Sequence, residues 1–247
     1  MKELMIGNAA LARGLYEAGC SVISSYPGTP STEITEEFAK FSDVYCEWAP
    51  NEKVAAETAF GASLRGKRSA CCMKHVGLNV AADPLFTMSY TGVNAGMVIC
   101  VADDPGMHSS QNEQDSRHYA VAAKVPMLEP ADSQEALNFA KIAFEISEEF
   151  DTPVFIKMCT RVAHSQSITE KGERTEVQKE YVKNPKKYIM APANAIARHP
   201  FVEERTRKLT EYAEASPLNR VEYGSGTYDF GIITSSTSYQ YVKEVFG

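Results

Sequence analysis

The sequence predicts an α/β fold of the doubly wound type, in which a mostly parallel sheet carries helices on both faces. Two observations lead to this prediction. From residue 1 to about residue 163, stretches with helical periodicity alternate with short apolar runs, and this alternation is typical of a parallel sheet wrapped by helices. The length of 247 residues also fits one large α/β domain with a remnant better than two average domains.

The individual elements follow from the same alternation. The expected strands are short and apolar and cover residues 20–25, 44–48, 69–73, 97–102 and 154–158. The expected helices cover residues 8–17, 30–41, 51–64, 78–90 and 133–150. The first helix is expected to stop at Gly19, because a glycine in the left-handed conformation commonly ends a helix. Pro30 suits the first turn of the second helix, which Thr29 or Ser31 can cap.

The chain changes character after residue 164. Charged residues crowd the stretch 165–223 and prolines interrupt it, so we expect a charged linker with one surface helix near 201–215. Residues 228–235 then predict a new strand, and residues 238–246 predict the helix that follows it. Since one βα unit cannot bury its own apolar face, residues 224–247 are expected to begin a second α/β domain that is cut short, after a first domain at 1–164.

Composition and charge narrow the classes of function. The formal net charge of −7 gives no basic footprint for DNA or RNA. No apolar run is long enough to span a bilayer and the start does not read as a signal peptide, so a cytoplasmic protein without a membrane partner is expected. The 6 cysteines form no C-x-x-C pair, which favours buried free thiols over a disulfide or an iron–sulfur site in this chain.

Functional sites in doubly wound folds lie at the carboxyl ends of the strands. The loops to examine are therefore 26–33, 49–53, 74–79 and 103–118. The second of these loops places Glu52 in the first turn of an Ala-rich helix. On residue type alone, Asn51 caps this helix and Glu52 complements the helix dipole, which needs no function.

Four segments in sequence order change that interpretation: YPGTPSTEI (26–34), EWAPNEKVAAETAFGAS (47–63), KHVGLNVAADPL (74–85) and VADDPGMHSSQNEQDSRHYA (101–120). Together they resemble the N-terminal part of the larger subunit of indolepyruvate:ferredoxin oxidoreductases. These enzymes belong to the thiamine-diphosphate-dependent 2-oxoacid:ferredoxin oxidoreductases. The resemblance covers residues 1–163 almost continuously, and it implies the pyrimidine-binding domain of such an enzyme.

The resemblance assigns roles to particular residues. In the family, the glutamate that corresponds to Glu52 activates the cofactor through a ring nitrogen of its pyrimidine. The resemblance therefore implies that Glu52 is catalytic and lies in a dry pocket. Thr29 is implied to face the substrate carboxylate or carbonyl, with a helix cap as the alternative. Gly28 stands where related pyruvate enzymes carry a bulkier apolar residue, so it implies room for an aryl side chain.

Further contacts to the cofactor are implied for Pro27, Gly77, Asn79, Asn112 and Gln114. His75 lies at a strand end, where it can donate to substrate or cofactor or only satisfy backbone groups. Asp103 and Asp104 are expected to cap a turn, since the magnesium and diphosphate ligands of the family belong to a different domain. The polar run 108–119 is expected to form an ordered loop near the active site or a subunit contact.

The implied reaction converts aryl 2-oxoacids such as indolepyruvate, with coenzyme A, into acyl-CoA, carbon dioxide and reduced ferredoxin. It implies thiamine diphosphate with Mg²⁺, [4Fe–4S] clusters elsewhere in the protein, a second smaller subunit and ferredoxin. Residues 224–247 are implied to begin a domain like the C-terminal domain of transketolases. The fragment alone is expected to be inactive and to associate with copies of itself. Two alternatives stay open: a subunit of a non-redox thiamine-dependent 2-oxoacid decarboxylase, and a non-catalytic interaction module.

Overall fold

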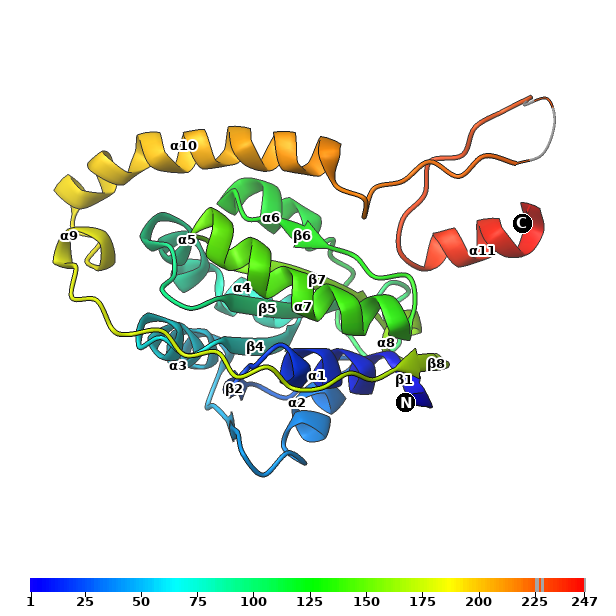
Figure 1. The fold of residues 1–247 in the computed structure, drawn as a ribbon, viewed down its shortest axis with the longest axis horizontal. Coiled ribbons are helices and arrows are strands. Elements are labelled where there is room, and N and C mark those ends of the chain that lie inside the picture. Colours follow the sequence, from blue (N-terminus) through cyan, green and yellow to red (C-terminus); the bar gives the residue numbers. More distant parts are fainter. Residues whose placement is uncertain (225–226, 228, 247) are drawn as a thin grey trace.

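A six-stranded sheet forms the centre of the computed structural model, which describes residues 1–224, 227 and 229–246 (Figure 1). Its strand order is β3-β2-β4-β5-β7-β6, and all neighbouring strands are parallel. The strands are β2 (Val22–Ser25), β3 (Tyr45–Trp48), β4 (Ser69–Lys74), β5 (Met97–Asp103), β6 (Met127–Leu128) and β7 (Val154–Cys159). The predicted doubly wound α/β class is confirmed.

Helices cover both faces of this sheet (Figure 1). One face packs against α1 (Gly7–Glu17), α2 (Thr32–Phe38) and α7 (Ser133–Phe150). The other packs against α3 (Glu52–Leu64), α4 (His75–Val80), α5 (Ala82–Thr91) and α6 (Arg117–Ala123). Alternation along the strands builds both layers, since Cys72 belongs to the first core and Cys71 to the second. The 6 cysteines are free, as predicted, and burial raises the pKa of the Cys71 thiol.

Two differences from the predicted elements have local causes. The helix expected at 78–90 is a pair, α4 and α5, and the proline at position 84 falls in the first turn of α5, where its missing N–H is tolerated. The second helix begins at Thr32 rather than at Pro30. The Thr29–Pro30 bond is cis, and residues 28–31 form a turn in which the Ser31 N–H donates to the Gly28 carbonyl at 2.8 Å.

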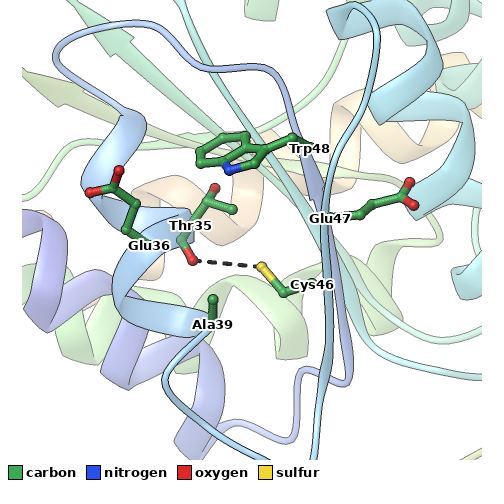
Figure 2. A pocket seen from close by; sticks show the side chains of 6 residues that line it. All are labelled: Thr35, Glu36, Ala39, Cys46, Glu47 and Trp48. Atoms are coloured by element: carbon green, nitrogen blue, oxygen red, sulfur yellow. Dashed lines mark hydrogen bonds between the residues drawn. The ribbon is translucent and has the colours of Figure 1, made fainter.

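The strand at one edge of the sheet, β3, borders a shallow hollow of about 350 Å³. Figure 2 shows it between α2 and β3, with Trp48 on one side and the Cys46 thiol close to the Thr35 carbonyl. The lining residues are Thr35, Glu36, Ala39, Cys46, Glu47 and Trp48. No residue that the sequence predicts for the active site lines this hollow.

A separate antiparallel pair joins the amino-terminal strand to a distant part of the chain. β1 (Lys2–Ile6) pairs with β8 (Gln166–Glu170), so that Lys2 lies opposite Glu170. The short helix α8 (Thr160–His164) connects β7 to this pair. The sequence does not predict either strand, because both are mostly exposed and no apolar run marks them.

The stretch expected to be a linker lies against the domain. After β8 the chain crosses the ends of α1 and α3, where the Thr175 N–H donates to the Glu17 carbonyl at 2.9 Å and the Lys179 N–H to the Gly66 carbonyl at 2.8 Å. It then forms α9 (Pro185–Tyr188) and the long helix α10 (Pro192–Ala215). Helix α10 therefore starts earlier than the helix expected near 201–215. Pro200 lies inside α10 and does not interrupt it.

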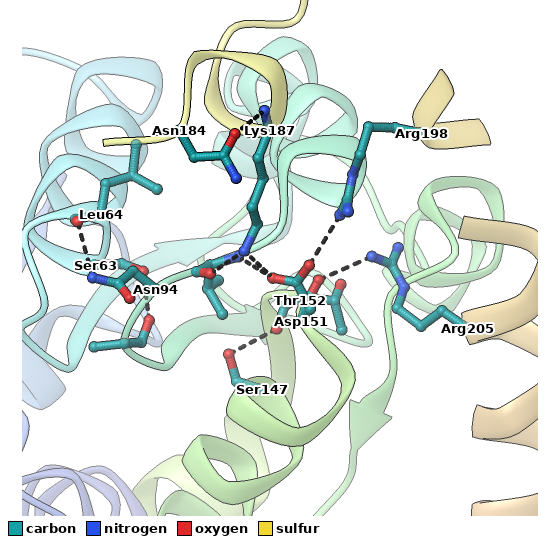
Figure 3. A network of polar contacts seen from close by, with 12 residues as sticks. Ser63, Leu64, Asn94, Ser147, Asp151, Thr152, Asn184, Lys187, Arg198 and Arg205 are labelled. Atoms are coloured by element: carbon teal, nitrogen blue, oxygen red, sulfur yellow. Dashed lines mark hydrogen bonds and ion pairs between the residues drawn. The ribbon is translucent and has the colours of Figure 1, made fainter. Parts of the chain in front are cut away.

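Polar contacts around Asp151 hold α9 and α10 in place (Figure 3). The Asp151 carboxylate accepts from Lys187 at 2.8 Å and from Arg198 at 3.0 Å. Arg205 is only 3% exposed, and its guanidinium donates to the Ser89 and Asp151 carbonyls at 2.8 and 3.0 Å. Burial lowers the pKa of this guanidinium to about 10. The charged segment is thus bound to the domain through its cations.

Beyond α10 the chain extends away and then returns to the start of α7 (Figure 1), where the Ser236 hydroxyl donates to the Pro130 carbonyl and Gln240 donates to Asp132. Residues 229–235 form no strand in the part of the chain that the structure describes, so the strand expected at 228–235 is wrong there; an isolated strand without a neighbour is not stable. Positions 225, 226, 228 and 247 lie outside the described residues. The helix expected at 238–246 is confirmed as α11 (Thr237–Phe246). The second domain and the boundaries after 164 and 223 stay predictions.

Candidate functional site

Parallel pairing brings the carboxyl ends of the strands to one edge of the sheet. At this edge β2 is followed by the loop 26–31, β3 by residues 49–51, β4 by the first turn of α4, and β5 by the loop 104–116. In the register, Ser25 lies beside both Trp48 and Cys72. The loops that the sequence predicts as functional are therefore neighbours in space.

Glu52 is the first residue of α3, and its side chain is largely withdrawn from solvent, with 8% of the residue exposed. The cap of this helix is Asn51, whose Oδ1 accepts from the Val54 N–H at 3.0 Å. The carboxylate of Glu52 makes no hydrogen bond or ion pair with any described residue. A largely buried glutamate whose carboxylate has no donor among the described residues can accept a hydrogen bond from, or share a proton with, a group that binds from outside the chain.

Gly77 of α4 lies against the Glu52 side chain. A Cβ atom at position 77 would come within 2.4 Å of Glu52 Oε1 and 2.7 Å of its Cγ. These separations are far below ordinary van der Waals contact. The absence of a side chain at Gly77 therefore gives the Glu52 carboxylate its position.

His75 is the buried first residue of α4. Its Nε2 lies 3.0 Å from the carbonyl oxygen of Asn112, so Nε2 carries the proton and donates to that oxygen. Its Nδ1 is buried and has no partner among the described residues. The structure thus shows the backbone contact foreseen as the alternative for His75, and this contact joins the end of β4 to the loop 104–116.

Two carboxylates organise the loop 104–116. Asp104 accepts from the hydroxyls of Ser110 and Thr160, each at 2.7 Å. Burial of Asp104 favours its neutral form, but these hydrogen bonds outweigh burial and lower its pKa to about 2. Asp103 accepts from the Ser116 N–H at 3.1 Å. Both residues hold the turn that follows β5, which is the role expected for them.

The other residues predicted for the site lie in the loop after β2, in α4 and in the loop 104–116. Pro27 and Thr29 are exposed in the loop after β2. Ser31 occupies the N-cap position of α2, but its side chain makes no cap hydrogen bond, and Thr29 is not the cap. The Gln114 amide donates to Asn112 Oδ1 at 2.8 Å within the loop 104–116. The exposed Asn79 accepts from the hydroxyl of Tyr119. The ordered loop predicted from 108–119 is therefore present at the edge that carries Glu52 and His75.

Gly28 makes room for a neighbour that sequence reasoning did not single out. A Cβ atom at position 28 would lie 2.9 Å from Cδ of Lys74. The space beside Gly28 thus holds the stem of this lysine, and a role for Gly28 in accepting an aryl group stays a prediction. A lysine that ends an otherwise apolar strand, SACCMK, is the signal in the sequence that points to Lys74.

This edge combines a nearly buried carboxylate, a glycine beside it and an ordered polar loop, as a cofactor-binding domain requires. The chain belongs to the family described as "Pyruvate flavodoxin/ferredoxin oxidoreductase, thiamine diP-bdg", which matches residues 13–226. The fold agrees with the 2-oxoglutarate:ferredoxin oxidoreductase from Magnetococcus marinus. That structure superposes with a TM-score of 0.78 at 17% identity, over 99% of this chain and 51% of the other.

Among curated proteins, the chain is similar to indolepyruvate oxidoreductase subunits. It is 45% identical to subunit IorA of Archaeoglobus fulgidus over 98% of this chain and 40% of the relative. It is 46% identical to subunit IorA of Pyrococcus horikoshii over 98% of this chain and 39% of the relative. The chain therefore spans about two fifths of the length of these relatives.

Proposed function

We propose that this chain is the cofactor-activating part of an oxidoreductase that converts aryl 2-oxoacids such as indolepyruvate, with coenzyme A, into acyl-CoA, carbon dioxide and reduced ferredoxin. The observation that carries the proposal is the nearly buried Glu52 carboxylate, which has no donor among the described residues and is positioned by Gly77. The similarity to subunits named for indolepyruvate supports the substrate class.

The residues at the sheet edge fit the pyrimidine end of thiamine diphosphate. When bound, this cofactor supplies the carbon nucleophile that attacks a 2-oxo group. Glu52 would hold a proton at Oε1 or Oε2 and would donate it in a hydrogen bond to a ring nitrogen of the bound pyrimidine. Gly77 keeps the carboxylate in position, and we assign further cofactor contacts to Pro27, Asn79, Asn112 and Gln114.

The substrate side of the site is assigned to the loop after β2 and to the start of α4. Thr29 is exposed at this edge, where its hydroxyl is available to a substrate oxygen. Gly28 lies next to it. His75 supports the site through its contact with the Asn112 carbonyl.

The rest of the protein supplies the remaining components of the proposed enzyme. These are the Mg²⁺ and diphosphate ligands, the [4Fe–4S] clusters, and the contacts with the smaller subunit, ferredoxin and coenzyme A. No described helix is long and apolar enough to cross a membrane. A cytoplasmic location and association between copies of the chain belong to the same proposal.

The proposal is tested with the full-length protein assembled with its smaller subunit. Indolepyruvate should reduce ferredoxin only when coenzyme A and thiamine diphosphate are both present. Release of carbon dioxide without coenzyme A or an electron acceptor would instead identify a non-redox decarboxylase. Ferredoxin reduction that does not require thiamine diphosphate would contradict the cofactor assignment.

A further inference from the structure

Lys74 ends the central strand β4 at the edge of the sheet that carries Glu52. It pairs in register with Ala102 of β5 and is half-buried, whereas the five residues before it in the strand are buried and uncharged. Its stem lies against Gly28, with Cδ and Cγ at 2.9 and 3.1 Å from the place of a Cβ atom there. The loop after β2 therefore fixes the direction of this side chain.

Within the part of the chain that the structure describes, the ammonium group of Lys74 has no counter-ion. It donates to the carbonyl oxygen of Ser109 at 2.8 Å, and no carboxylate of the described chain lies within 4.0 Å of it. Two other cations near the loop 104–116 are paired, since Lys157 lies 3.5 Å from Glu129 and Arg117 binds the same carboxylate. Lys74 is thus a cation at this edge whose charge no carboxylate within ion-pairing distance offsets.

An ammonium has three N–H donors, and the Ser109 carbonyl uses one of them. The other two can bind an anion that reaches the loop after β2. Asp104, a carboxylate of the same loop, already accepts from Ser110 and Thr160. A charge-assisted hydrogen bond from an ammonium group to an anion is stronger than a neutral one, which favours an anionic ligand at this point.

We propose that Lys74 binds the carboxylate of the 2-oxoacid substrate, an inference that rests on the proposed function. Every 2-oxoacid carries this carboxylate next to the carbon that reacts. Lys74 lies between Gly28, which is next to Thr29, and the loop 104–116, so it can hold the carboxylate while Thr29 faces the adjoining oxygen. Gly28 then serves to admit the lysine stem.

The test separates charge from packing in the assembled full-length holoenzyme. Lys74→Met keeps a stem beside Gly28 and removes the charge, whereas Lys74→Arg keeps a cation. The probes are 3-(indol-3-yl)propionate, which retains the carboxylate but has no 2-oxo group, and its neutral amide. Calorimetry should show about a tenfold or greater rise in the Kd of the propionate for Lys74→Met, as for loss of a charged hydrogen bond. The amide should bind unchanged.

Lys74→Arg should recover much of the affinity for the propionate, and the KM for indolepyruvate should rise in Lys74→Met more than kcat falls. Lys67→Met is the matched control, because Lys67 lies just before the other end of the same strand and contacts the neutral side chain of Gln178. Equal weakening of propionate and amide, or unchanged binding of the propionate, overturns the role of Lys74. Failure of the unmodified holoenzyme both to bind the propionate and to oxidise indolepyruvate overturns the proposed function as well.

Discussion

Gly77 lies so close to Glu52 that a Cβ atom there would come within 2.4 Å of the carboxylate oxygen Oε1. Gly77→Ala must therefore displace this carboxylate or shift α4. We expect kcat/KM of the full-length enzyme to fall by about 100-fold, because a misplaced acid–base group loses most of its effect. Overpacking of this kind also costs about 1–3 kcal/mol of stability, measured by urea unfolding.

The control for this variant is Gly61→Ala in α3, where a Cβ atom meets nothing within 4 Å. Activity should be unchanged, and stability should rise by about 0.5–1 kcal/mol because alanine is the better helix former. A Gly77→Ala enzyme with normal activity would contradict the positioning role of Gly77.

Glu52→Gln removes the proton-sharing carboxylate but keeps the size of the side chain. We expect a loss of about 10²–10⁴-fold in kcat/KM, with retained folding by circular dichroism. Since Gly77 acts through Glu52, the double variant with Gly77→Ala should lose little more activity than Glu52→Gln alone. Glu57→Gln, on the exposed side of the same helix, is the control. Full additivity of the two losses would show that Gly77 acts independently.

Asp104 makes stability depend on pH in the acidic range. Its pKa is lowered from 3.8 to about 2, so its contribution is complete above about pH 4 and disappears as pH falls through 2. The difference corresponds to about 2 kcal/mol. Asp104→Asn should therefore destabilise the chain near pH 6 and much less near pH 2, as followed by urea unfolding across pH. The exposed Asp83→Asn should leave the wild-type profile unchanged, and a pH-independent effect of Asp104→Asn would refute the assignment.

Arg205 fixes α10 to the domain through hydrogen bonds to the Ser89 and Asp151 carbonyl groups. Arg205→Met should lower the free energy of unfolding by about 2 kcal/mol, as expected for loss of buried hydrogen bonds from a charged group. It should also speed proteolytic cleavage between residues 171 and 191. Arg207→Met removes only exposed ion pairs on the same helix and should cost less than about 1 kcal/mol. Equal effects of the two variants would mean that the buried contacts are not the anchor.

Elements with strong local signals could be predicted from the sequence. Helix α7 matches its predicted range, since its apolar positions recur at helical spacing and Asp132 caps it through the Glu135 N–H. The start of α3 follows from Asn51 in the same way. The resemblance of four segments to one family then predicted a catalytic role for Glu52, and that role stays a prediction.

Contacts between distant elements could not be predicted in this way. The crossing of α3 and α4 that places Gly77 against Glu52 depends on how two helices pack over the sheet. Helix α10 is held by Arg205, whose partner Ser89 lies 116 positions away in the sequence. A charged surface helix and a docked helix look alike in sequence, because the difference lies in partners that local patterns do not specify.

The pairing of β1 with β8 affects the order in which this domain can form during synthesis. Lys171, just after β8, contacts Glu3 across 168 positions of sequence, so β1 has no partner strand until most of this domain has been made. Pairing over such a separation is slow because a long loop must close. The amino-terminal strand is therefore the first part of the domain to be translated and is expected to be among the last to be immobilised.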